Sequence, residues 1–150
     1  MTKIAAFLYE EGYILRSGGA AGADTYFEDG VPHADGKNIY LPDKGFNKNP
    51  SPLYGVCEQA LEIASKIHPA WHACRAYARL LHARNVYQVL GKDLKTPSRF
   101  LLCWTERGES KGGTRTAIKL AEQYDIPVLN FGSVRGDPMN AFDLFYMRAA

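Results

Sequence analysis

Apolar residues recur at helical spacing along much of the chain. The clearest stretch spans residues 53–67, where six apolar residues follow one another at intervals of one, three or four: Leu53, Val56, Cys57, Ala60, Ala64 and Ile67. Pro69 ends this predicted helix. Start and stop residues predict further helices at 2–11, about 21–29, about 71–90, 114–125 and 137–148, with Thr2 able to cap the first of them.

Short apolar segments between these helices predict strands at 13–16, 38–42, 99–105 and 126–131. The segment 99–105 is an apolar run, which is typical of a strand that is buried on both faces. Strands and helices alternate, which predicts the α/β class with an open parallel sheet of about four strands flanked by helices. The 150 residues fit a single domain, 1–150.

Two glycine-rich loops follow predicted strands and open predicted helices. The first contains Ser17, Gly18, Gly19 and Gly22, and the second ends in Gly112, Gly113 and Thr114. Open parallel sheets bind ligands at this edge, where free amides at a helix start favour an anion such as phosphate. A plain tight turn is the alternative for the first loop, which matches neither GxGxxG nor a P-loop, and Thr114 could serve only as an N-cap.

Two carboxylates, Asp24 and Glu28, lie four residues apart on one face of the helix after the first loop. Asp24 could cap this helix, or it could grip ribose hydroxyls as acids do in dinucleotide folds. Glu28 could face solvent or pair with a base. Both are weak candidates for catalytic residues.

Basic side chains near the predicted sheet edge are candidates for contacts with an anionic ligand. Arg16 precedes the first glycine loop, and Lys44 follows the second predicted strand. Arg84 shares a helical stretch with His82 and Asn85, although such a stretch is also typical of a solvated face. The aromatic residues Trp71 and Tyr77 are more typical of a core than of cofactor stacking.

Charge and composition exclude several broad classes. The net charge is +2, from 18 basic and 16 acidic residues, which does not indicate nucleic acid or membrane as a partner. No apolar run approaches the roughly 18 residues that span a bilayer. Glu10 and Glu11 lie where a signal peptide has small residues, so we expect a cytoplasmic protein.

The cysteines and histidines predict neither a metal site nor a cofactor. Cys57, Cys74 and Cys103 are odd in number and lie in apolar runs, which indicates buried thiols in a reducing compartment. His68 and His72 are four residues apart, but the intervening proline breaks the helix that would align them.

Several motifs together resemble the SLOG superfamily, the Rossmann-like group that includes lonely-guy phosphoribohydrolases and DNA-processing protein A. "SGGAAGAD" is similar to its first glycine motif and "GGTRTAIKLAEQYDIPVLN" to its second, and the resemblance covers residues 4–131. "IYLPDKGF" and "LHARNVYQVLGKDL" resemble a subgroup that is common in bacteriophage and prophage genomes. The resemblance implies a crevice for nucleotides or nucleotide-derived signals, frequent homo-oligomers, and ligand contacts at the matching positions: Ser17, Gly18, Gly19, Gly22, Asp24, Gly112, Gly113 and Thr114.

The chain departs from the family pattern in two ways. The phosphoribohydrolases have a "PGGxGTxxE" motif with a catalytic glutamate, whereas this chain has Ala117 at that position and Lys111 in place of the proline. Members of the family also begin with a strand and a glycine-serine-arginine loop ahead of the helix that corresponds to 2–11. We therefore expect the sheet to lack that first strand, and its crevice to be incomplete or completed by another subunit.

These motifs favour binding over cleavage. The leading hypothesis is a protein that binds an ADP-ribose-like or cyclic nucleotide between its two glycine loops, sensing or sequestering it in a phage-infected bacterial cell. The alternative is an N-glycoside hydrolase of nucleoside monophosphates that uses Asp24 or Glu28. A further alternative is single-stranded DNA binding through Arg75, Arg79 and Arg84, which lie on one predicted helix.

Overall fold

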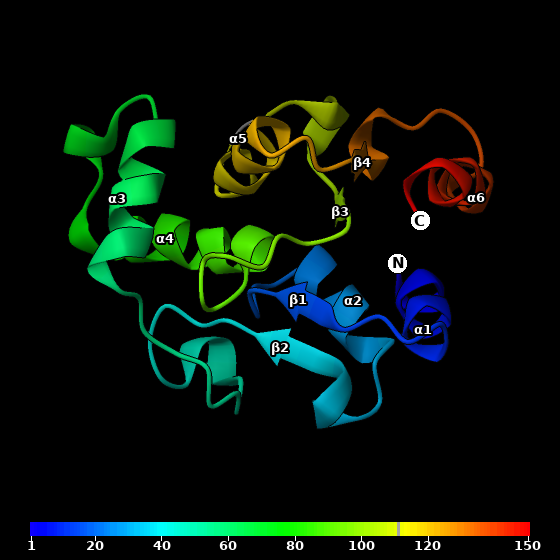
Figure 1. Ribbon diagram of the computed structural model, residues 1–150, viewed down its shortest axis with the longest axis horizontal. Coiled ribbons are helices and arrows are strands. Elements are labelled where there is room, and N and C mark those ends of the chain that lie inside the picture. The colour runs from blue at the N-terminus through cyan, green and yellow to red at the C-terminus, as the bar shows by residue number, and fades with distance from the viewer. Residues whose placement is uncertain (111) are drawn as a thin grey trace.

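The computed structural model describes residues 1–110 and 112–150, which form a mixed α/β structure (Figure 1). Its described α-helices are α1 (Thr2–Glu10), α2 (Ala23–Asp29), α3 (Glu58–Ile67), α4 (Ala76–Leu90), α5 (Thr114–Gln123) and α6 (Pro138–Ala149). The strands are β1 (Leu15–Ser17), β2 (Lys37–Ile39), β3 (Leu101–Cys103) and β4 (Val128–Asn130). Short 3-10 turns connect them: η1 (Ala34–Gly36), η2 (Phe46–Lys48), η3 (Trp71–Ala73), η4 (Glu106–Gly108) and η5 (Phe131–Ser133). Lys111, which stands where the phosphoribohydrolase motif has its proline, lies outside the described residues.

The described strands form two separate parallel pairs. Leu15 of β1 lies opposite Lys37 of β2, and Leu101 of β3 lies opposite Val128 of β4. The parallel pairing agrees with the sequence, but a single open sheet of about four strands is not confirmed. Each strand is only three residues long, and Figure 1 shows the two pairs set apart, with α4 running beside the gap.

Two apolar clusters hold the described residues together. The first joins α3, α4 and α5 through small residues such as Ala60, Ala64 and Ala83, which are fully buried and let the helices approach closely. The second joins α1, α2 and α6 around Ile4, Phe27 and Phe142. Packing of such faces, rather than helix propensity, supplies most of the stability of short helices.

Strand β3 is less buried than its sequence predicts. Leu101 packs against the first cluster and Leu102 against the second, as alternation along a strand requires. Both side chains nevertheless remain partly exposed. They line a cavity on the side of β3 away from β4, so the prediction of a strand buried on both faces is wrong for these two residues.

Several helices begin elsewhere than predicted. The predicted helix at 53–67 starts at Glu58, because Leu53 and Gly55 instead exchange backbone hydrogen bonds with Leu41. Thr2 does not cap α1 but is its first residue, and its hydroxyl donates to the Tyr26 carbonyl at 2.9 Å. Asp137 does cap α6, by accepting a hydrogen bond from the Met139 amide at 3.1 Å.

The predicted helix at 71–90 is divided, because Cys74 and Arg75 are extended between η3 and α4. This bend folds Trp71 back over α4, where the Arg79 guanidinium lies 5.3 Å from its ring centre. Trp71 packs against the first cluster as predicted. Tyr77 does not belong to the core: it is exposed, and its hydroxyl donates to Asp43 at 2.9 Å. Among the described residues, no helix combines the length and the apolar character that crossing a bilayer requires.

Candidate functional site

One turn of α4 holds both glycine loops. Arg84 donates a hydrogen bond to the Gly18 carbonyl of the first loop, and the next residue, Asn85, donates to the Gly113 carbonyl of the second at 2.6 Å. Gln88, one turn further along, donates to the Asn85 side-chain oxygen at 2.9 Å. These three residues, the α4 anchor, therefore fix the positions of the two loops relative to one helix.

The Arg84 guanidinium is buried without a carboxylate partner. Arg84 is 5% exposed, and none of the described carboxylates forms an ion pair with its guanidinium. Burial lowers the pKa of Arg84, and the charge of nearby Asp24 opposes this shift. Arginine nevertheless stays cationic in proteins, so the first loop is built around an incompletely compensated positive charge.

Two buried polar atoms at this loop have no hydrogen-bond partner among the described residues: Arg84 Nε and Ser17 Oγ. Ser17 is 3% exposed and ends β1, immediately before the loop. Unsatisfied buried polar groups cost about 1–3 kcal/mol each and are rare without a functional reason. A donor set of this kind suits an anion.

Gly18 allows the close approach of Arg84 to the first loop. A Cβ atom added to Gly18 would lie 2.6 Å from one guanidinium nitrogen of Arg84 and 2.7 Å from Nε2 of Gln88. Such distances are shorter than real Cβ contacts, so the ends of the Arg84 and Gln88 side chains would have to move away from the loop to admit any other residue here.

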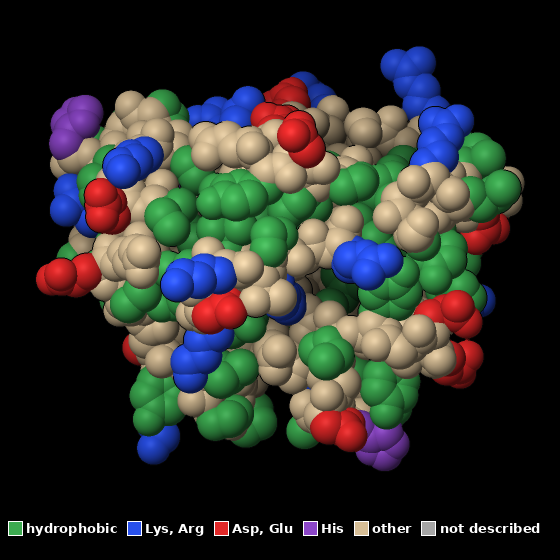
Figure 2. Space-filling view, viewed as in Figure 1, with side chains coloured by type: hydrophobic (Ala, Val, Ile, Leu, Met, Phe, Trp, Pro, Cys, Tyr) green, Lys and Arg blue, Asp and Glu red, His purple; other side chains and the backbone are tan. Residues whose placement is uncertain are grey.

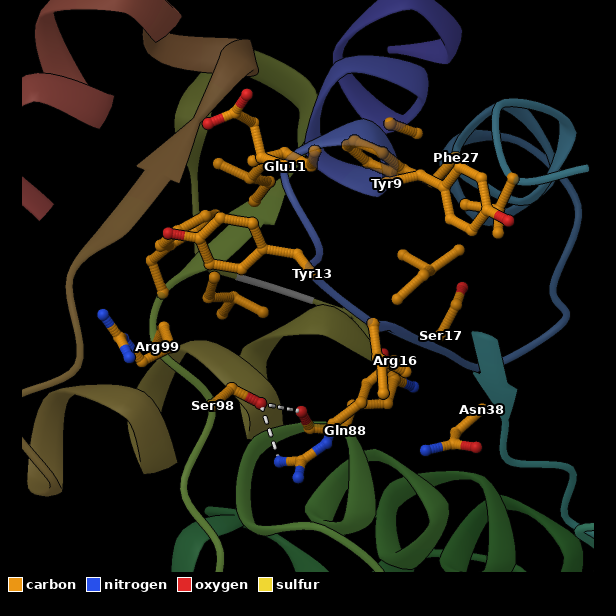
Figure 3. A pocket seen from close by; sticks show the side chains of 18 of the residues that line it. Tyr9, Glu11, Tyr13, Arg16, Ser17, Phe27, Asn38, Gln88, Ser98 and Arg99 are labelled. Atoms are coloured by element: carbon orange, nitrogen blue, oxygen red, sulfur yellow. Dashed lines mark hydrogen bonds between the residues drawn. The ribbon is translucent and has the colours of Figure 1, made fainter. Parts of the chain in front are cut away.

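A cavity of about 790 Å³ opens beside the first loop, between β1 and β3 (Figure 3). This volume lies in the range of ligand pockets, about 300–1,000 Å³. Its polar lining near the loop includes Arg16, Ser17, Asp24, Asn38 and Gln88. The face drawn in Figure 2 is hollowed near its centre, with hydrophobic side chains inside the hollow and basic side chains near its edge.

Arg16 lines this cavity but is held at one wall. Its guanidinium donates to the Thr96 carbonyl at 2.6 Å and to Ser98 Oγ at 3.1 Å (Figure 3). Ser98 in turn donates to the Gln88 carbonyl at 2.7 Å. Arg16 therefore connects β1 to the segment before β3 and to α4, and contributes positive charge to the cavity wall.

The structure brings only part of the predicted ligand set to the cavity. Arg16, Ser17 and Asp24 line it. Arg84 and Gly18 are not among the lining residues but adjoin them, since Gly18 follows Ser17 and accepts a hydrogen bond from Arg84. Five further predicted residues are not among the described residues that line the cavity: Gly19, Gly22, Gly112, Gly113 and Thr114.

Lys44 is exposed on the loop after β2 and is not among the cavity-lining residues. The sequence placed it next to a strand end, but β2 stops at Ile39, and the chain then runs beside Leu53 before it reaches Lys44. The described structure therefore gives Lys44 no place in the site.

Asp24 closes the first loop. Its carboxylate accepts a hydrogen bond from the Ala20 amide at 3.1 Å, in the first turn of α2. An acid at this position also complements the helix dipole. The prediction that Asp24 caps α2 is wrong, because Gly22 is the N-cap and no side chain caps it. Asp24 instead shapes the loop and lines the cavity.

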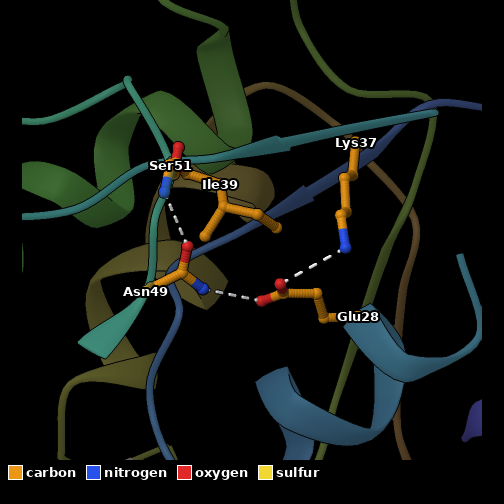
Figure 4. A network of polar contacts seen from close by, with 5 residues as sticks. All are labelled: Glu28, Lys37, Ile39, Asn49 and Ser51. Carbon is orange, nitrogen blue, oxygen red and sulfur yellow. Dashed lines mark hydrogen bonds and ion pairs between the residues drawn. The ribbon is translucent and has the colours of Figure 1, made fainter. Parts of the chain in front are cut away.

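Glu28 serves a structural network rather than the cavity (Figure 4). Its carboxylate pairs with Lys37 at 3.3 Å and accepts a hydrogen bond from Asn49 at 3.0 Å. Asn49 also accepts from the Ser51 amide at 3.0 Å, and Ser51 Oγ donates to the Ile39 carbonyl at 2.6 Å. The prediction that Glu28 pairs with a base is confirmed, and a catalytic role has no support from these contacts.

The second loop differs from its prediction at Thr114. Gly113 occupies the N-cap position of α5, and Thr114 is the first helical residue without a capping hydrogen bond from its side chain. Ala117, at the position where the phosphoribohydrolase motif has its glutamate, is buried on α5. No carboxylate is thus offered at that position.

Asn85 and Gln88 are the site residues that sequence reasoning missed as loop anchors. The prediction of a solvated face for this stretch is wrong, because Ala83, Arg84 and Asn85 are all buried. A signal was present: Arg84, Asn85 and Gln88 are polar, lie at helical spacing, and are surrounded by apolar residues between Ala83 and Leu90. Buried polar residues in that setting need partners, and here the loop carbonyls supply them.

The basic residues of α4 do not form an exposed stripe. Arg75 precedes the helix as its N-cap, Arg79 stacks on Trp71, and Arg84 is buried. A nucleic-acid site needs accessible cations that track phosphates. The described part of α4 therefore gives no support to single-stranded DNA binding.

The three cysteines differ in environment, and the prediction of uniformly buried thiols is wrong for Cys57, which is exposed at the start of α3. Partial burial opposes ionisation of Cys57, but the Tyr87 hydroxyl at 3.3 Å and the amides of Gln59 and Ala60 outweigh it and lower the pKa of the thiol. Burial raises the pKa of Cys103 to about 11. Burial and the hydrogen bond to Cys57 also raise the pKa of Tyr87 to about 12.

We therefore expect Cys57 to be alkylated first when iodoacetamide is added to the native protein near neutral pH, and Cys103 only after unfolding, because the thiolate is the reactive form. Peptide mass spectrometry over time measures this order. Tyr87→Phe removes the hydroxyl donor and should slow Cys57 alkylation at fixed pH. Equal rates in the two proteins would contradict the role of Tyr87.

Comparison of the chain with protein-family models found no match, and neither curated proteins nor solved structures gave one. The SLOG resemblance therefore stays a prediction from the sequence motifs.

Proposed function

We propose that the chain binds a phosphate-bearing nucleotide or nucleotide-derived signal, such as an ADP-ribose or a cyclic nucleotide, between its glycine loops and in the adjoining cavity. The observation that carries this proposal is the buried Arg84 guanidinium, which lacks a carboxylate partner and donates to the carbonyl of Gly18, the residue after the unpartnered Ser17 hydroxyl. A phosphate would satisfy both charge and hydrogen bonding there. The phosphate-binding tendency of glycine loops at helix starts supports the same ligand class.

Binding without cleavage is the form of this proposal that the side chains favour. Ala117 leaves the family's glutamate position without a carboxylate, and Glu28 is occupied by Lys37 and Asn49. Asp24 remains as a group that could contact ribose hydroxyls. The proposed role is to sense or sequester the ligand in a phage-infected cell.

Isothermal titration of the purified protein with AMP, ADP-ribose and cyclic AMP tests the proposal. We expect at least one of them to bind with measurable heat, and chromatography of the recovered ligand to find it intact. A well-folded sample that binds none of the three would overturn the proposal. Release of free base from AMP would replace it with the hydrolase alternative.

Gly113→Ala separates the second loop's role in binding from its role in folding. Gly113 has helical backbone angles, and an added Cβ would lie 3.7 Å from the Asn85 side chain, an ordinary contact. We expect the free energy of unfolding to change by less than about 0.5 kcal/mol. Nucleotide affinity should fall about tenfold, because the new methyl group keeps phosphate away from the loop backbone.

Titration calorimetry and urea unfolding of the same Gly113→Ala sample give the two readouts. Unchanged affinity in this variant would exclude the second loop from the site and leave the cavity beside the first loop as the binding region.

The two strand pairs are proposed to be halves of one Rossmann-like sheet with room for a further strand between β1 and β3. The cavity supports this, because both strands line it and each is paired on one edge among the described residues. A crystal structure of the ligand-bound protein tests the strand position, and a cavity with ligand but no strand would contradict it.

The exposed Leu144 and Met147 of α6 support a homodimer, which the family resemblance implies. Light scattering tests the dimer, and a monomer in solution would contradict it.

A further inference from the structure

Three side chains from separate segments converge at the bend between α3 and α4. His68 follows α3, Cys74 follows η3, and His82 lies on α4. Their potential ligand atoms all lie within 4.8 Å of one another, and each residue is partly exposed. None of these residues belongs to the site proposed for nucleotides.

The distances fit a tetrahedral metal ion. Cys74 Sγ lies 3.6 Å from His68 Nε2 and 3.8 Å from His68 Nδ1, and the two imidazole rings are 4.6 Å apart between centres. Zinc bonds of about 2.3 Å to sulfur and about 2.0–2.1 Å to nitrogen place neighbouring ligand atoms about 3.5 Å apart. Only a small closing movement is needed for all three atoms to reach one ion.

The surroundings orient two of these groups. His82 Nδ1 and the hydroxyl oxygen of Thr116 are 2.9 Å apart, and Thr116 is fully buried on α5. When Nδ1 donates to this hydroxyl, the lone pair of Nε2 is left for a metal, which is the usual arrangement around ligating histidines. Trp71 covers one side, with its ring 6.4 Å from His68 and 6.5 Å from His82.

The existing contacts of His68 and Cys74 at these atoms include one hydrogen bond each to the Ala70 backbone. The Ala70 amide donates to His68 Nδ1 at 3.0 Å, and Cys74 Sγ donates to the Ala70 carbonyl at 3.6 Å. A metal bound through these atoms would exchange both contacts for ligand bonds. The neighbouring cation, Arg79, is engaged with the Trp71 ring and its carbonyl, at 5.3 Å and 3.0 Å.

We propose that His68, Cys74 and His82 form a binding site for a zinc-class transition metal ion. Imidazole and thiolate ligands select zinc, cobalt or copper over magnesium and calcium. The Cys74 thiol binds as the thiolate and releases its proton to solvent, without any change in oxidation state. Three protein ligands leave a fourth position for water, and the ion joins α3, η3 and α4 where the chain bends.

The test is a titration of protein freed of metal by dialysis against EDTA. With Co²⁺ we expect one ion per chain and the thiolate-to-cobalt charge-transfer band in the near ultraviolet. With Zn²⁺ we expect an increase in Tm, because an ion that binds only the folded state stabilises it. A protein that binds neither ion under these conditions would overturn the proposal.

Matched variants distinguish this site from adventitious metal binding. His68→Gln and Cys74→Ser should each weaken binding more than about 100-fold. The controls are His72→Gln, four residues from His68 and exposed, and Cys57→Ser, the exposed thiol outside the cluster. The assignment would be contradicted if Cys74→Ser kept the thiolate-to-cobalt band, or if Cys57→Ser lost it. His68→Gln keeps the test decisive if Cys74→Ser fails to fold, and nucleotide titration of the same samples shows whether the two sites are independent.

Discussion

Replacement of Arg84 by methionine is expected to remove most nucleotide binding while it leaves the fold intact. Arg84 is the buried cation on α4 that contacts the first loop, and its Nε has no hydrogen-bond partner among the described residues. Charge-assisted hydrogen bonds contribute about 1.5–3 kcal/mol, so affinity for the nucleotide that binds the wild type should fall roughly 10- to 150-fold.

Two opposing effects keep the stability of Arg84→Met close to that of the wild type. Methionine removes a buried, incompletely compensated charge, and such replacements are often neutral or stabilising. It also removes the hydrogen bond to the Gly18 carbonyl, which costs about 1–3 kcal/mol if that carbonyl stays buried and unpaired. We expect the free energy of unfolding in urea to change by less than about 1.5 kcal/mol.

Arg75→Met is the matched control, because Arg75 is an exposed arginine at the N-cap of the same helix. It should change neither affinity nor stability. If Arg84→Met unfolds the protein, Arg84 is a structural residue and the main support for the proposed function disappears. If Arg84→Met binds nucleotide as well as the wild type does, the ligand is held elsewhere.

Replacement of Gly132 by alanine is expected to have the largest effect on stability. Gly132 lies in η5, directly after β4, where an added Cβ would overlap the Thr105 carbonyl oxygen. Asn130 fixes this contact: its side-chain oxygen accepts from the Thr105 amide at 3.1 Å and from the Gly132 amide at 3.0 Å. Its amide nitrogen donates to Thr105 Oγ1 at 2.6 Å.

The backbones after β3 and β4 must therefore separate to admit a methyl group at position 132. Overpacking a tight site typically costs 1–3 kcal/mol, and a backbone collision with three hydrogen bonds around it should reach about 3 kcal/mol. This is a large part of the 5–15 kcal/mol that stabilises an ordinary domain. Urea unfolding measures this loss of stability, with Gly113→Ala as the neutral glycine control. Equal stability of the two variants would show that the segments after β3 and β4 are not packed as described.

Local sequence signals predicted most of the helices and the parallel pairing. The apolar spacing of α3, the Asp137-Pro138 start of α6 and the glycine after α4 are each readable from neighbouring residues, because capping and amphipathic packing act over a few positions. The start of α3 was predicted five residues early, because the pairing of Leu53 and Gly55 with Leu41 is a contact between distant residues.

The candidate site was predicted in its residue types rather than in its arrangement. The glycines, Asp24 and Arg84 stood out in the sequence, because glycine loops at helix starts carry a local signature. That Arg84 reaches the first loop and Asn85 the second depends on how α4 packs between segments 28 to 66 residues away. No local spacing encodes such a distance, so Asn85 and Gln88 were not recognised as anchors.

The sequence by itself determined the alternation of helices and strands, the two glycine loops and the presence of Ala117 where the motif that the chain resembles has a glutamate, since each is a matter of residue identity or short-range periodicity. Only the tertiary structure decided that Glu28 pairs with Lys37 and Asn49 and that Arg84 is buried without a carboxylate partner. It also decided that His68, Cys74 and His82 lie close together. Burial and partnership depend on which distant segments pack together, and that packing sets the charge and the hydrogen-bonding capacity left for a ligand.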